Sequence, residues 1–187
     1  MTLKRNAFLK IANVDIQLYK TLNRRGQLPT SPIAVKMELE VADPLPDADG
    51  KDTPLEALKL HFADVLVTNN SFSRKAAADL FSGLRVGFSQ AIARAEAGED
   101  IWFVAGGWSF PGEAEAPRLE EQLGGVWSFT EFGTLHEVNT AISEEIATTK
   151  AAGGVVSHIS MFFMTPLVQA ALERGREFGV TSFVNIE

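Results

Sequence analysis

The segment from Val14 to Pro29 reads VDIQLYKTLNRRGQLP and predicts a short helix with well-defined ends. Asp15 is suited to begin this helix, because its carboxylate can accept hydrogen bonds from the first free backbone amides. Gly26 can adopt the left-handed conformation that ends a helix, and the proline that follows prevents the helix from resuming. The apolar side chains at helical spacing, which predict the buried face, are Leu18, Tyr19 and Leu22. We therefore expect a helix over residues 16–25, the second of a helix-turn-helix.

The opposite face of this expected helix is polar and basic. Its side chains are Gln17, Lys20, Thr21 and Arg24. Lys and Arg neutralise phosphates, and the amide of Gln can both donate and accept a hydrogen bond at a base edge. A helix with such a face can lie in the major groove, so double-stranded DNA is the first partner that the sequence predicts.

The spacing of this segment resembles that of the MerR-like (mercury-resistance-type) regulators and the excisionase-like winged helices. The positions in step with that pattern are Val14, Asp15, Gly26, Leu28 and Pro29, with Leu18, Tyr19 and Leu22 at its buried positions. The resemblance covers residues 1–30 closely and residues 1–100 loosely. It implies that Gln17, Lys20, Thr21 and Arg24 face DNA, and that Lys4, Arg5, Lys10 and Arg25 contribute no more than contacts to the DNA backbone.

The chain departs from this family pattern after the proline, where a short basic hairpin, the wing, normally follows. Residues 30–51 hold two lysines, Lys36 and Lys51, against five acidic residues. An acidic wing repels phosphate, so either the wing is remodelled or the module does not bind DNA alone. Lys20 and Thr21 also stand where larger contact residues are common, so the resemblance implies no particular DNA sequence.

The charge of the chain is distributed unevenly. Residues 1–25 contain six Lys and Arg against a single Asp, a net charge of +5 in a chain whose formal net charge is −7. The remaining residues therefore carry −12. A basic segment on an acidic body is typical of a DNA-reading module joined to a partner domain, although a solvated basic terminus would show the same charge.

The composition indicates a folded globular protein, with 187 residues of which 45% are hydrophobic and 22% charged. The chain has no cysteine, which excludes disulfides, thiolate zinc sites and cysteine nucleophiles and fits a reducing compartment. No basic and apolar leader opens the sequence, so a cytoplasmic protein is expected. Residues 151–172 lack Asp, Glu, Lys and Arg, yet their glycines, polar residues and Pro166 favour a buried strand, turn and helix over a membrane span.

The hydrophobic patterns predict an α+β fold with two domains: a helical, winged helix-turn-helix head over residues 1–98 and a smaller α+β domain over residues 99–187. A first helix is expected around Phe8 and Ile11, and Thr53, Pro54 and Glu56 form a capping-box pattern before a further helix. Other expected helices cover residues 73–84, residues 88–98 and a last segment that Thr165-Pro166 is expected to cap. Expected strands cover residues 33–41, 101–105, 126–132 and 155–162.

The sequence offers little catalytic chemistry. His61, His136 and His158 lack metal-ligand spacing, and no phosphate-binding loop or nucleophile elbow is present. Glu131, His136 and Glu137 could form an acid-base group, although such proximity is common by chance. Residues 106–112 form a glycine-rich stretch that predicts a structural turn or, less strongly, a ligand pocket. We therefore expect no enzyme, no metal and no cofactor.

Our leading hypothesis is a sequence-specific transcriptional regulator that places the helix over residues 16–25 in a major groove and uses its second domain to dimerise or to sense an unidentified effector. Aromatic residues of that domain form either the core or a homodimer interface: Trp102, Phe103, Trp127, Phe129, Phe162 and Phe163. The alternative is a protein-binding scaffold of phage or toxin-antitoxin type, in which the helix-turn-helix survives as a packing unit.

Overall fold

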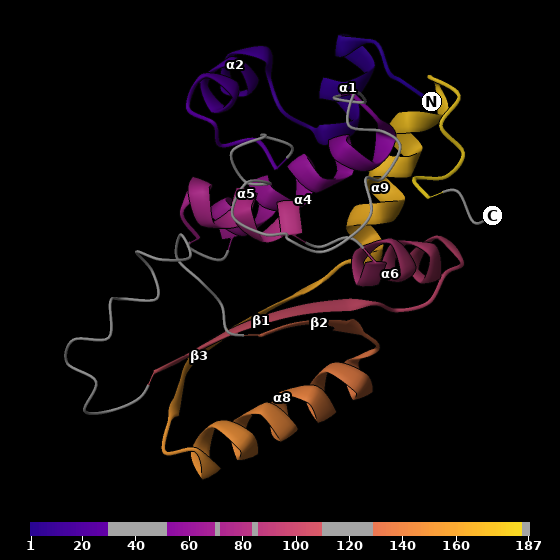
Figure 1. The fold of residues 1–187 in the computed structure, drawn as a ribbon. Coiled ribbons are helices and arrows are strands. Elements are labelled where there is room, and N and C mark those ends of the chain that lie inside the picture. Colours follow the sequence, from indigo (N-terminus) through magenta and orange to yellow (C-terminus); the bar gives the residue numbers. More distant parts are fainter. Residues whose placement is uncertain (30–51, 70–71, 84–85, 110–128, 185–187) are drawn as a thin grey trace, which may run out of the picture. The chain divides into compact units, whose positions relative to one another are not determined.

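The computed structural model describes residues 1–29, 52–69, 72–83, 86–109 and 129–184. Within these ranges the chain forms seven helices and a three-stranded antiparallel sheet (Figure 1), which confirms the α+β class. The strand expected over residues 33–41 and the wing lie outside the described residues. None of the described helices is long and apolar enough to cross a bilayer.

The residues form two compact units. Unit 1 comprises Met1–Arg85 and Gln169–Glu187, and unit 2 comprises Val86–Val168. The expected division into residues 1–98 and 99–187 stays a prediction. The two units group the residues differently from this division, because residues 169–187 belong to the same unit as residues 1–85.

Unit 1 is helical. It contains α1 (Arg5–Ala12), α2 (Ile16–Arg24), α4 (Pro54–Asn69), α5 (Arg74–Gly83) and most of α9 (Thr165–Arg176). The helix predicted after Thr53 is confirmed, and the Thr53 hydroxyl accepts a hydrogen bond from the Glu56 amide at 3.2 Å. The core residues that are fully buried include Ile11, Leu58, Phe62, Leu66 and Phe81.

Unit 2 contains α6 (Val86–Glu96), β1 (Trp102–Ser109), β2 (Phe129–Gly133), α8 (Leu135–Ala151) and β3 (Val155–Phe163). The strand order is β2-β1-β3, and Phe103 on the central strand lies opposite Phe132 and Phe162. These rings pack on one face of the sheet, where Phe88 of α6 lies 5.9 Å from Phe132. Helix α8 lies on the other face (Figure 1).

Two local expectations were wrong, and one helix was not predicted. Gly106 and Gly107 lie within β1 and do not form a turn. A Cβ on Gly106 would stand 2.0 Å from the Phe129 ring, so only glycine leaves room for this ring over the strand. Helix α8 was not predicted, although the Thr134 and Glu137 capping box marks its start. The Thr165 hydroxyl does not cap α9, because it donates to Glu99 O at 2.6 Å and accepts from the Ile101 amide at 2.9 Å.

Candidate nucleic-acid interface

Helix α2 is fixed at both ends by local contacts. The Asp15 carboxylate accepts hydrogen bonds from the amides of Gln17 at 2.7 Å and Leu18 at 2.8 Å, which confirms the predicted N-cap. At the other end, Gly26 has φ +64° and the Gln27 amide donates to Leu22 O at 2.9 Å. The helix therefore has little freedom to fray at either end.

The turn between α1 and α2 is three residues long. Asn13 adopts the left-handed conformation at φ 55°, and the Val14 amide donates back to Leu9 O at 3.2 Å. The ring of Tyr19 on α2 packs edge-on against Phe8 on α1, with centroids 5.8 Å apart. Together these contacts join α1 and α2 through a short, fixed turn.

The polar face of α2 is exposed to solvent. Gln17, Lys20 and Arg24 are exposed and Thr21 is partly exposed, while Tyr19 and Leu22 on the opposite face are buried. Residues three or four apart on a helix line up along one side, so this spacing places the polar side chains in one row. The chain therefore presents a row of hydrogen-bonding and cationic groups.

The cations of this region divide into two groups. Arg5 pairs with Asp52 at 2.9 Å, and Lys10 pairs with Glu177. Lys20, Arg24 and Arg25 form no ion pair with any residue in the described ranges. The predicted contact Lys10 thus has an acidic partner, which separates it from Lys20, Arg24 and Arg25.

Two side chains from other helices hold the carboxyl end of α1. The Arg174 guanidinium of α9 donates to Ile11 O, at 2.8 Å from Nη2 and 3.2 Å from Nε. His61 of α4 is 7% exposed, and its Nδ1 lies 3.2 Å from Ala12 O. Burial, and then the nearby Arg174 charge, lowers the pKa of His61 to about 4, so the imidazole is neutral at pH 7 and donates from Nδ1. Sequence reasoning missed both contacts.

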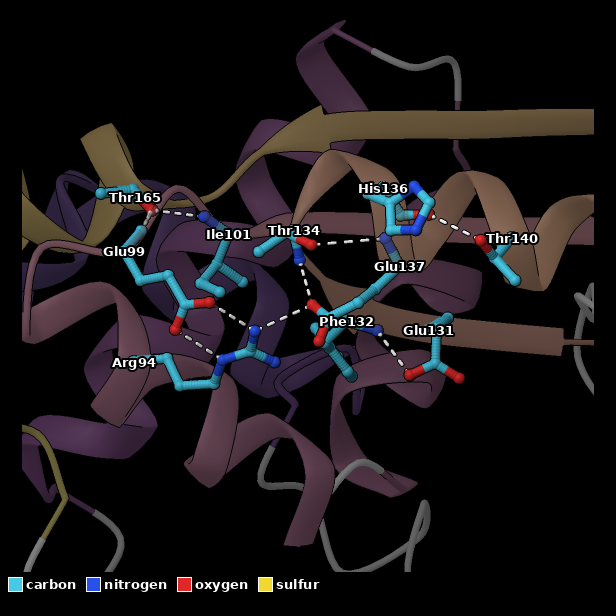
Figure 2. A network of polar contacts seen from close by, with 10 residues as sticks. All are labelled: Arg94, Glu99, Ile101, Glu131, Phe132, Thr134, His136, Glu137, Thr140 and Thr165. Atoms are coloured by element: carbon cyan, nitrogen blue, oxygen red, sulfur yellow. Dashed lines mark hydrogen bonds and ion pairs between the residues drawn. The ribbon is translucent and has the colours of Figure 1, made fainter.

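The acid-base group considered from the sequence is part of a polar network that holds α8 (Figure 2). The Glu137 carboxylate accepts from the Thr134 amide at 2.5 Å and from Arg94 Nη2 at 2.8 Å. The amide of Thr134 and the Arg94 guanidinium lower the pKa of Glu137 to about 2, which holds this carboxylate ionised. Figure 2 shows Glu131 turned toward the Phe132 amide, so the three residues do not converge on one point. We assign the network a structural role.

The aromatic residues considered for a dimer interface differ in how deeply they are buried. Phe103 is fully buried and Phe162 is 9% exposed, so both belong to the core of unit 2. Trp102 and Phe163 are partly exposed and stack on each other with centroids 4.8 Å apart. Trp127 lies outside the described residues.

Comparison of the chain with protein-family models, with curated proteins and with solved structures found no match. The resemblance to MerR-like and excisionase-like proteins therefore stays a prediction from the spacing of residues 14–29. Among the described residues, no group of three His, Asp or Glu side chains could hold a metal ion.

Proposed function

We propose that α1 and α2 form a DNA-binding helix-turn-helix of MerR-like or excisionase-like type, and that α2 enters the major groove of double-stranded DNA. The observation that carries the proposal is the exposed row of Gln17, Lys20 and Arg24 on a helix whose ends are fixed. Neither cation of this row has a carboxylate partner among the described residues, so phosphate is a suitable partner for both.

The side chains of the row have two roles in this proposal. Lys20 and Arg24 neutralise phosphates, and Gln17 reaches a base edge near the start of α2. The amides of Gln17 and Leu18 at the start of α2 already donate to the Asp15 carboxylate. The proposal therefore gives the helix terminus no phosphate contact. The exposed Lys4 and Arg25 add contacts to the DNA backbone.

Binding of wild-type protein to fluorescent duplex DNA, titrated by anisotropy at several salt concentrations, tests this function. Each phosphate neutralised contributes about −0.9 to the slope of log K against log salt. Two to four contacts by one protomer therefore give a slope between about −2 and −4. Association that does not depend on salt, or none with a pool of random genomic fragments, contradicts the proposal and favours the scaffold function.

We further propose that the regulator acts as a homodimer, paired through β3 of unit 2. Within the described residues β3 pairs on one side, with β1. Val155, Ile159 and Met161 on this strand are 54%, 38% and 37% exposed. An open groove of about 440 Å³ runs beside the strand, lined by Ile146, Lys150, Gly154, Val155, Val156 and Ile159.

The charge pattern leaves this strand as the part of unit 2 where a second copy can pack. Residues 86–168 hold eleven Asp and Glu against three Lys and Arg, so the net charges of two copies of unit 2 repel each other. Residues 151–172 carry none of these charges. Two β3 strands can therefore approach each other without placing like charges side by side, and an edge strand lacking Lys is open to such pairing.

The substitution Ile159→Lys is expected to convert the dimer into a monomer in sedimentation equilibrium, because it places two like charges at the centre of the paired strands. Thr148→Lys adds the same charge at an exposed position of α8 and should leave the dimer intact. Dissociation by both variants, or by neither, would contradict pairing through β3, as would a wild-type monomer at tens of micromolar.

A further inference from the structure

We infer that Arg174 and His61 are positioning residues for DNA binding, which hold the carboxyl end of α1 and thereby fix the direction in which α2 leaves the turn. This inference rests on the proposed function of α2. Neither residue lies on the row that faces DNA: Arg174 belongs to α9 and His61 to α4.

The hydrogen bonds of the last turn of α1 show why these two residues are needed. A helix leaves its last four carbonyls without partners inside the helix. In α1, Leu9 O accepts from the Val14 amide and Lys10 O from the Asn13 amide, both at 3.2 Å. Two carbonyls remain, those of Ile11 and Ala12, and both of these residues are fully buried. The partners of these last two carbonyls are Arg174 and His61.

The end of α9 holds α1 at further points beside the Arg174 contact. Glu177 pairs with Lys10, and the Phe178 ring lies 5.8 Å from Lys10 Nζ. Gly175 also lies beside α1, since a Cβ at this position would stand at an ordinary contact distance of 3.6 Å from Ile11 Cδ1. A segment more than 160 residues away in sequence thus fixes the end of the helix that precedes the turn.

The position of α2 depends on this end of α1 because the connection is short. Residues 13–15 form the whole turn, and α2 begins at Ile16. If the carbonyls of Ile11 and Ala12 lose their partners, the last turn of α1 loosens, since a buried carbonyl without a partner is unfavourable. The turn and the start of α2 then sample other directions, and only part of the population can enter the groove.

The substitution Arg174→Met tests the inference, because it keeps an unbranched apolar side chain and removes every donor. We expect about tenfold weaker duplex binding, which is the size of effect of losing a charged hydrogen bond. The slope of log K against log salt should not change, because Arg174 touches no phosphate. Arg174→Lys retains a donor and should recover most of the affinity. By NMR hydrogen exchange, the amides of Val14, Gln17 and Leu18 should exchange about tenfold faster in Arg174→Met than in wild type.

The control is Phe81→Leu, which removes part of the ring contact with Phe62 in the core of unit 1 but keeps Arg174, His61 and the residues of α1. It should leave both DNA affinity and these amides unchanged in the folded protein. Wild-type affinity in Arg174→Met would overturn the inference, as would an equal loss in Phe81→Leu. If wild-type protein does not bind duplex DNA, the proposed function fails. Amide exchange then still decides whether Arg174 holds the turn: faster exchange in Arg174→Met supports that role, and unchanged exchange overturns it.

Discussion

Replacing Lys20 and Arg24 together by alanine is expected to weaken duplex DNA binding roughly 60-fold per bound protomer at 0.1 M salt. The reason is the loss of two phosphate contacts, which reduces the slope of log K against log salt by about 1.8. If the variant and wild type bind equally well at 1 M salt, this change in slope gives the stated ratio of their affinities at 0.1 M salt. Anisotropy titrations of both proteins with one duplex, from low to high salt, measure the affinity and the slope together.

The matched control is the double substitution Lys75→Ala with Arg176→Ala. It changes the net charge by the same amount, but these cations are paired with Asp79 and Glu173. We expect its affinity to stay within about threefold of wild type and its salt slope to stay the same. Lys20 and Arg24 are exposed, so their loss should change the free energy of unfolding by no more than about 0.5 kcal/mol. Equal losses in the two double variants would show that net charge, not the face of α2, controls binding.

Local signals in the sequence predicted α2 and its ends correctly, because the contacts that form them are close in sequence. Asp15 bonds to amides two and three residues further on, and Gly26 ends the helix through its own backbone. The burial of Tyr19 and Leu22 follows from helical spacing alone. The same kind of signal was present at Thr134 and Glu137, so α8 could also have been predicted from the capping box.

Contacts between distant segments could not be predicted in this way. No local pattern indicates that Arg174 donates to Ile11 O, or that Asp52 pairs with Arg5, because these pairings depend on how the helices of unit 1 pack. Six cations in residues 1–25 were evident from the sequence. The sequence could not show which of these cations have an acidic partner among the described residues. Lys10 has one, Glu177, whereas Lys20 and Arg24 have none there.

Gly106 shows a further limit of reading a sequence locally. Consecutive glycines predict a turn because glycine favours unusual backbone conformations. Here glycine is required because Phe129, on the neighbouring strand, places its ring over the backbone. The pattern of glycines is the same in both cases, so only the register of β1 and β2 distinguishes them.

The stability of the protein is expected to fall as the pH is lowered from 6.5 to 4, with His61 as a main cause. Burial and the Arg174 charge lower the pKa of His61 from 6.5 to about 4 in the folded protein. Between these two values the unfolded chain binds a proton that the folded protein does not, so acidification favours unfolding. The full contribution is present above pH 6.5, and by pH 4.5 about 2.5 kcal/mol of it should be lost.

The variant His61→Asn separates this contribution from that of the carboxylates, which titrate in the same range. The asparagine amide can donate to Ala12 O in place of Nδ1 but does not titrate. Urea titrations at pH 7.5, 6.5, 5.5 and 4.5 give the free energy of unfolding of wild type and variant. The difference between the two proteins should change by about 2.5 kcal/mol from the highest pH to the lowest. A flat difference for His61→Asn would mean that His61 is not held neutral in the folded protein. The burial of His61 against the end of α1 would then be wrong, whereas the hydrogen bond to Ala12 O does not depend on the charge of the ring, because both forms can donate from Nδ1.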